Sequence, residues 1–102
     1  MNGYKEKMNR YRHDKETMIK LKEYCFSTRD YTIIKQALAN TFHPDDIIND
    51  YMFKHVTIKN YEWAKLECDA LPCCRDTFRL YRAKFFYNLN ERLKEVSPSE
   101  PS

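Results

Sequence analysis

The chain has 102 residues, of which one is Gly, four are Pro and 15% are aromatic. A chain of this length forms one small core, and so few Gly and Pro residues argue against an all-β sandwich or barrel, which needs many tight turns. The net charge of +3 is too small to identify a nucleic-acid binder by itself. We therefore expect a single all-α domain over residues 1–96, built from four to five helices.

The chain also lacks the sequence features of membrane proteins, secreted proteins and enzymes. No stretch approaches the roughly 18 apolar residues that span a bilayer, and the first residues lack the apolar core of a signal peptide. We expect a cytoplasmic protein that does not associate with membranes and whose four Cys residues are reduced. Because His13, His43 and His55 are scattered and no phosphate loop or nucleophile motif is present, we expect neither catalysis nor a cofactor.

The first two predicted helices occupy residues 4–24 and 28–42. In the first, apolar residues recur every three to four positions, at Tyr4, Met8, Tyr11, Met18, Leu21 and Tyr24. Ser27 and Asp30 have the spacing of a capping box ahead of the second. The buried stripe of the second helix is expected to contain Ile33, Ile34, Ala37, Leu38 and Phe42.

Two shorter helices should follow. Pro44 and two carboxylates favour a helix start, and the apolar face after it consists of Ile47, Ile48, Tyr51, Met52 and Phe53. The β-branched segment HVTI, residues 55–58, is expected to interrupt this helix. Asn60 is the predicted cap of a fourth helix over 61–70, whose inward residues are Trp63, Leu66 and Cys68.

The longest periodic segment begins at Arg75. Its core stripe, at steps of three and four residues, is Phe78, Tyr81, Phe85 and Leu89. After Val96 the chain contains only Ser, Pro and Glu, so residues 97–102 are predicted to be a disordered tail.

Residues 60–93 have the components of a helix-turn-helix: a short helix, a turn and a basic second helix that would enter the major groove. With the core stripe facing inward, the residues that point outward near the helix start are Arg75, Asp76, Arg79, Leu80 and Ala83. Arginines there can read guanine and Asp76 can accept from cytosine, whereas phosphate contacts are predicted for Arg82, Lys84 and Lys65. An ordinary solvated helix face remains the alternative.

The segment CCRDTFRLYRAKFFYNL, residues 73–89, resembles the final helix of sigma factor region 4 and of phage late-transcription regulators of the RinA and ArpU type. The resemblance implies an N-cap role for Cys74, base-facing positions for Arg75, Asp76 and Arg79, and a turn at residues 71–73. It further implies a DNA-binding transcriptional regulator of phage or prophage type, with duplex DNA and RNA polymerase as partners. A single module makes few base contacts, so a homodimer is a further expectation.

Three other readings stay open. The aromatic residues Tyr51, Phe53, Trp63, Phe86 and Tyr87 exceed the needs of one small core, which favours a helical interaction module of phage or viral type that binds a host protein. Cys68, Cys73 and Cys74 with His55 could supply four zinc ligands, although adjacent cysteines seldom bind one tetrahedral ion. The thiol of Cys73 could be activated by the positive end of the following helix.

Overall fold

The computed structural model describes residues 11, 13–43 and 45–96. Within them the chain forms five α-helices and no strand, so the predicted all-α class is confirmed. The helices are α2 (Lys15–Ser27), α3 (Thr32–Thr41), α4 (Ile48–Thr57), α5 (Trp63–Cys68) and α6 (Arg75–Val96). The first turns of the predicted helix 4–24, Pro44 and the predicted tail 97–102 lie outside the described residues.

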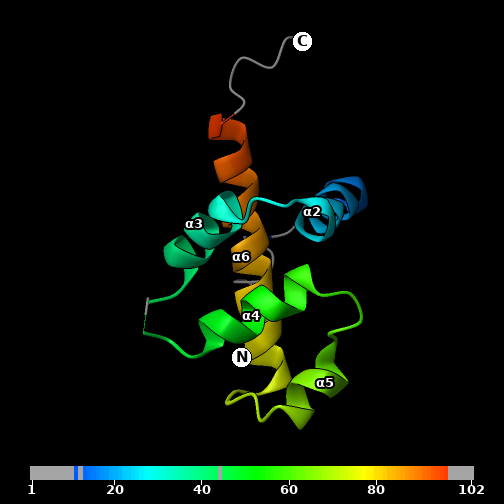
Figure 1. The fold of residues 1–102 in the computed structure, drawn as a ribbon, viewed down its shortest axis with the longest axis vertical. Coiled ribbons are helices and arrows are strands. Elements are labelled where there is room, and N and C mark those ends of the chain that lie inside the picture. The colour runs from blue at the N-terminus through cyan, green and yellow to red at the C-terminus, as the bar shows by residue number, and fades with distance from the viewer. Residues whose placement is uncertain (1–10, 12, 44, 97–102) are drawn as a thin grey trace.

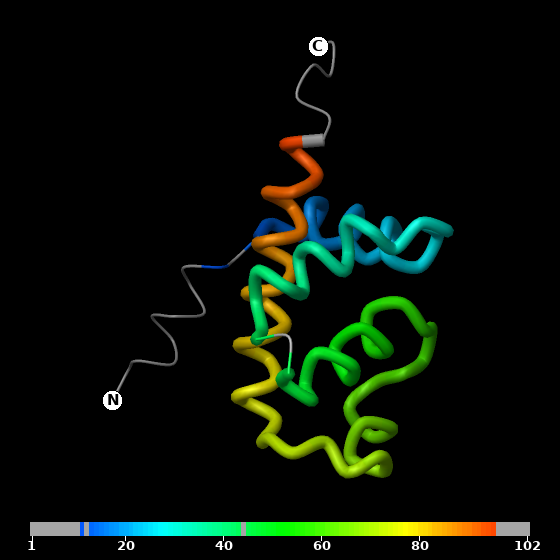
Figure 2. Tube along the Cα trace, turned by 60° about the vertical axis from the view of Figure 1, so that its left-hand side comes forward, coloured from blue at the N-terminus to red at the C-terminus, as the bar shows by residue number. Residues whose placement is uncertain are grey.

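Helix α6 is the axis around which the domain is built (Figure 1). Its 22 residues span about 33 Å at 1.5 Å per residue. Helix α3 lies along its C-terminal half, α2 crosses beside it, and α4 and α5 gather near its N-terminal end (Figures 1 and 2). None of the helices described is both long and apolar enough to cross a membrane.

The core contains the predicted inward residues of α6 and the apolar stripes of the helices that surround it. Its buried members are Leu21, Cys25, Ile34, Ala37, Leu38, Phe42, Ile48, Met52, Val56, Tyr61, Leu66, Phe78, Phe85, Phe86 and Leu89. Tyr81, the remaining residue of the predicted stripe, is half-buried and packs its ring edge-on against Phe42 at 5.3 Å between centroids. Periodicity therefore predicted the inner face of α6 correctly.

The capping box predicted at Ser27 and Asp30 is wrong. Ser27 is the last residue of α2, and its hydroxyl donates back to the carbonyl of Glu23 at 2.7 Å. Asp30 instead accepts from the backbone N–H of Thr32 at 3.0 Å and from its hydroxyl at 2.6 Å, so α3 begins at Thr32. Asp30 therefore caps α3 from two residues before Thr32, whereas a capping box requires a spacing of three residues.

Helix α4 extends to Thr57, further into the segment 55–58 than expected, and ends there because Ile58 is extended. Ile48, Met52 and Val56 are four residues apart and all buried, so burial of this stripe outweighs the low helix propensity of the β-branched residues. Ile47, predicted on the same face, is instead 58% exposed.

Helix α5 is shorter than the predicted helix 61–70. Asn60 does not cap it: its φ of 67° is left-handed, and the N-cap position belongs to Glu62. Trp63 and Leu66 pack inward as predicted, whereas Cys68 is exposed. The helix ends early because Ala70, with φ of 62°, turns the chain out of it.

Candidate nucleic-acid interface

The segment between α5 and α6 sets the position of the arginines. The hydroxyl of Tyr51 donates to the carbonyl of Asp69 at 2.6 Å, and the hydroxyl of Tyr61 donates to the Asp69 carboxylate. The latter bond raises the pKa of Tyr61 to about 12, since ionisation of the phenol would place a second negative charge beside the carboxylate. Two tyrosines of α4 and of the α4–α5 connection thus fix the end of α5 from which the chain enters α6.

Cys74 stands at the N-cap position of α6, where the resemblance to region 4 would put it. Its carbonyl accepts the first helical hydrogen bond from Phe78 N–H at 3.0 Å, and its Sγ lies 3.1 Å from the hydroxyl of Thr77. Hydrogen bonds with Thr77 hold the pKa of this exposed thiol below its usual range. The first two turns of α6 then carry Arg75, Asp76 and Arg79 with their side chains exposed.

The exposed arginines have no carboxylate partner in the part of the chain that the structure describes. The ion pairs found there are His43–Asp45, Arg92–Glu95 and Lys94–Glu91, and none of them includes Arg75 or Arg79. Arg75 instead lies over the ring of Trp63, its guanidinium carbon 5.9 Å from the ring centroid. A cation–π contact of this kind orients a guanidinium without neutralising its charge.

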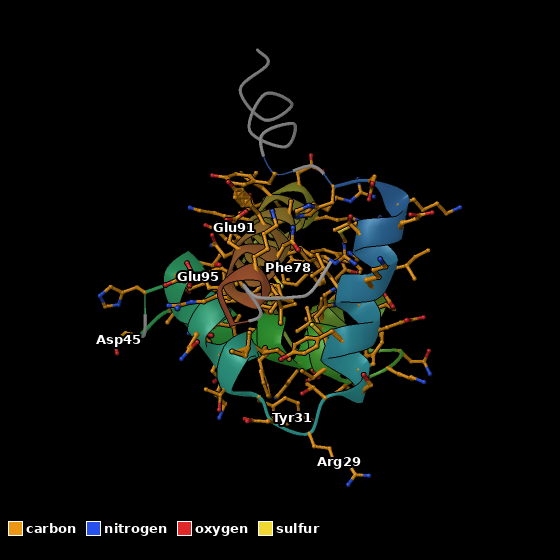
Figure 3. The ribbon with its side chains drawn as sticks, turned by 90° about the horizontal axis from the view of Figure 1, so that it is seen from above. Arg29, Tyr31, Asp45, Phe78, Glu91 and Glu95 are labelled. Atoms are coloured by element: carbon orange, nitrogen blue, oxygen red, sulfur yellow. The ribbon has the colours of Figure 1, made fainter. Side chains whose placement is uncertain are left out.

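Three arginines meet at one surface hollow of about 190 Å³ between α5 and α6. Arg75, Arg79 and Arg82 are four and three residues apart, so they share one face of α6. The other residues that line this arginine hollow are His55, Glu62, Trp63, Leu66 and Phe78. Phe78, which is buried, lines the hollow from inside the bundle (Figure 3).

Arg82 is placed differently from the free phosphate ligand that the sequence predicts. It is half-buried, its Nε donates to Nε2 of His55 at 3.0 Å, and its guanidinium carbon is 5.0 Å from the centroid of Phe86. Burial holds its pKa below the usual value. Arg82 therefore packs into the domain and reaches the surface at the arginine hollow and at a neighbouring hollow between α2 and α6 that Lys22 and Phe26 also line.

His55 is neutral and in a defined tautomer. Its Nδ1 lies 2.8 Å from the carbonyl of Tyr61, which can only accept, so Nδ1 carries the proton and Nε2 accepts from Arg82. Burial is the main reason that its pKa is lowered, and the charge of Arg82 acts in the same direction. Since both ring nitrogens are occupied, this histidine is not available to the zinc site considered from the sequence.

The remaining predicted site residues do not join the hollow. Asp76 and Leu80 lie on the next face of α6, the first exposed and the second half-buried. Lys84 is half-buried and lies about 200° around the helix from Arg82. Lys65 is exposed on α5 but is not among the residues that line the hollow.

Sequence reasoning missed Trp63, Glu62 and His55 as parts of the site. Periodicity assigned Trp63 to the core, and no spacing rule relates it to Arg75 twelve positions later. Their contact depends on the path of residues 69–74, which includes the left-handed Ala70. His55 has no local signal for its role because its partner, Arg82, is 27 residues away.

The aromatic residues that suggested a partner surface are largely used by the fold. Phe86 is 1% exposed, and Tyr51, Phe53 and Trp63 pack against the core. Tyr87 is half-buried and meets the ring of Tyr11 edge-on at 5.5 Å. Among the residues with described side chains, the exposed large hydrophobic ones are others, namely Ile19, Phe26, Tyr31, Ile47 and Ile58.

The four cysteines are free thiols in different environments. Burial raises the pKa of Cys25 to about 12 and also raises the pKa of Cys73, contrary to the activated thiol considered for Cys73. Among the residues with described positions, no group of three or more His, Cys, Asp or Glu side chains is arranged to hold a metal ion.

Comparison with protein-family models, curated proteins and solved structures finds no match to this chain.

Proposed function

We propose that this protein binds duplex DNA through the first turns of α6 and acts as a non-enzymatic regulator of transcription. The observation that carries the proposal is the pair Arg75 and Arg79, exposed on one helix face, with no carboxylate partner among the described residues. Guanidinium groups one helical turn apart can make bidentate contacts with guanine or with phosphate.

The surroundings of these arginines suggest the orientation of the DNA. Glu62, Glu67 and Asp69 place negative charge around α5, which disfavours a duplex laid across that helix. On the other side of the arginines, Asp76 is exposed and can accept from a cytosine amino group. We therefore assign base contacts to Arg75, Asp76 and Arg79, with Leu80 beside them. Lys65 lies on α5 and Lys84 on the far side of α6 from Arg75, so we do not assign this duplex the phosphate contacts that the sequence predicts for them.

The test is fluorescence-anisotropy binding of the full chain to duplex DNA over a salt series. Neutralising several phosphates makes the affinity fall steeply with salt. Replacing Arg75 and Arg79 by Ala should cost about 1 to 3 kcal/mol for each base-reading residue. Arg29→Ala is the matched control, because Arg29 is also exposed but points away from the body of the molecule in the α2–α3 connection (Figure 3).

Two outcomes would reject the proposal: affinity that does not respond to salt, or equal losses for the control and the α6 variants. A regulator with one such helix makes few base contacts, so we also propose that it works as a homodimer or beside another DNA-bound protein such as RNA polymerase. Both are tested by mass measurement of the protein–DNA complex with and without polymerase.

A second candidate function is binding of a partner protein. Ile19 and Phe26, seven residues apart on α2, are 46% and 37% exposed and lie on one side of that helix. If DNA binding fails, replacement of both by Ser in a pull-down with host extract is the corresponding test.

A further inference from the structure

Arg82 is a half-buried cation that the described residues neutralise incompletely. Removing a charge from water is costly unless a partner of opposite charge compensates. A guanidinium has five N–H donors, yet the hydrogen bond found for Arg82 in the described part of the chain is the one from Nε to neutral His55. The group also lines the arginine hollow, where its remaining donors can meet a ligand.

The arginine hollow as a whole also carries more positive than negative charge. Three guanidinium groups, of Arg75, Arg79 and Arg82, face one carboxylate, that of Glu62, which leaves an excess of two positive charges. His55 adds no charge, because it is held neutral. An anion with two negative charges would balance this set.

The size of the hollow restricts which anion it can hold. Its volume of about 190 Å³ is below the roughly 300 to 1,000 Å³ of sites that enclose drug-sized molecules. It is about six times the 30 Å³ share of one liquid water. The hollow therefore has room for one phosphate group with few further atoms, and not for an enclosed nucleotide. A planar guanidinium also suits this ligand, because its N–H donors match the geometry of phosphate oxygens.

We infer that the arginine hollow is a phosphate-binding pocket in which Arg75, Arg79 and Arg82 hold one phosphate group. The assignment of this phosphate to a nucleic-acid backbone rests on the proposed function, whereas the inference that the ligand is a phosphate does not depend on it. A guanidinium has five N–H donors, so Arg75 and Arg79 can contact this phosphate and a neighbouring base edge at the same time, whereas the half-buried Arg82 contacts the phosphate alone.

Trp63 supplies a direct reporter. It is the only tryptophan of the chain and it lines the hollow with Arg75 over its ring. Titration of the full chain with inorganic phosphate, at ionic strength held constant with chloride, should change its fluorescence saturably with a Kd on the order of 1 mM. Absence of a saturable change, or an equal change with chloride alone, would overturn the pocket.

Variants that change one charge distinguish binding of phosphate in the pocket from attraction by the overall charge of the protein. Arg82→Gln should weaken phosphate binding about tenfold and Glu62→Gln should tighten it about threefold, since each changes one charge beside the ligand. Lys94→Gln is the control: it removes one charge from α6 about 18 Å along the helix, beyond the Debye length of about 8 Å at physiological salt. Should Arg82→Gln fail to fold, unchanged affinity in Glu62→Gln is enough to refute the pocket.

A competition with duplex DNA distinguishes this inference from the proposed function. If both hold, inorganic phosphate displaces the duplex and Arg82→Gln weakens both ligands. Duplex binding that needs Arg75 and Arg79, but is unaffected by phosphate and by Arg82→Gln, overturns the pocket and leaves the function standing. Phosphate binding without any duplex binding supports the pocket, rejects the function and points to a free phosphate ester as the ligand.

Discussion

The Nε of Arg82 donates a hydrogen bond to Nε2 of His55 at 3.0 Å, across 27 residues of sequence. The same imidazole donates through Nδ1 to the carbonyl of Tyr61 and meets the ring of Phe78 edge-on at 5.3 Å. One neutral ring therefore joins α4, the connection before α5, and α6. This arrangement links the geometry of the arginine hollow to the protonation state of His55.

The stability of the domain should fall as the pH drops below about 6.5, the ordinary pKa of histidine. The folded-state pKa of His55 is lowered, mainly by burial, so between that pKa and 6.5 the unfolded chain binds more protons and acidification favours unfolding. The charged groups that act on it are Arg82 of α6, Lys22 of α2 and Glu62 beside α5. Urea denaturation at pH 7.5 and at pH 5.5 measures the difference.

His55→Gln is the matched variant, since its amide does not titrate and can still accept from Arg82. The loss of stability between the two pH values should shrink in this variant; an identical loss would assign the effect to other groups. Asp14 and Asp30 do not act in this range. Their pKa values are lowered by hydrogen bonds from Thr17 and Thr32, so their contributions are complete above about 3.8 and disappear only at lower pH.

Phe86 should be a structural residue and not part of a partner surface. It is 1% exposed, packs against Phe85 at 5.2 Å between ring centroids, and lies beneath Arg82. Phe86→Ala should lower the free energy of unfolding by about 3 to 5 kcal/mol, because it leaves a cavity in the core. Phe26→Ala, at a site that is 37% exposed, should cost about 1 kcal/mol or less. Equal costs in chemical denaturation would contradict the packing described.

The case of Arg82 shows which part of the site can be predicted from sequence. A helical wheel puts Arg82 about 20° from Arg75, and on that basis both belong to one outer face. A helical wheel takes no account of neighbouring helices. In the structure, His55 of α4 covers the turn of α6 that carries Arg82, whereas Arg75 and Arg79 in the first two turns stay exposed. Periodicity therefore predicts the inner stripe of α6 and the direction of its first arginines, but not how far the outer face extends.

Helix ends are the other part of the fold that pattern alone predicts poorly. Asp14 caps α2 by accepting from Thr17 N–H at 2.8 Å, inside a segment that reads as one continuous helix. Asn60 and Ala70 take left-handed backbone conformations, for which their sequence neighbours give no periodic signal. These few dihedral angles decide where α5 lies, and with it the position of Trp63 against Arg75.

Adjacent cysteines 73 and 74 should differ in reactivity. The pKa of Cys74 is lowered by hydrogen bonds with Thr77, whereas burial raises that of Cys73. Timed alkylation read by peptide mass spectrometry at pH 7.5 should label Cys74 before Cys73, and Cys25 last. A pKa of about 12 in place of 9.0 leaves Cys25 with about a thousandfold less thiolate.

Thr77→Val tests the cause of the difference between the adjacent thiols. It keeps the shape of the side chain at the start of α6 and removes the hydroxyl that lies 3.1 Å from the Cys74 sulfur. Labelling of Cys74 should slow in this variant, while labelling of Cys73 should not change. If Cys74 keeps its rate, the hydroxyl is not what favours its thiolate.

Ala70→Gly should stabilise the protein. Ala70 has φ of 62° at the end of α5, where its N–H donates to the carbonyl of Glu67 at 3.0 Å and the next N–H, of Leu71, donates to the carbonyl of Leu66 at 3.1 Å. This is the Schellman pattern of hydrogen bonds, which usually has Gly at the left-handed position. An alanine held there costs about 1 to 2 kcal/mol, because its Cβ crowds the following carbonyl.

Part of that cost is offset in the variant, since Gly gives the unfolded chain more conformational freedom. We therefore expect Ala70→Gly to raise the free energy of unfolding by up to about 1 kcal/mol, measured by urea denaturation. Ala39→Gly is the control, because Ala39 is exposed within α3 and the same change there should lower stability by about 1 kcal/mol. Losses of similar size in both variants would mean that residue 70 is not left-handed in solution. The contact between Trp63 and Arg75, which depends on this turn, would then be contradicted as well.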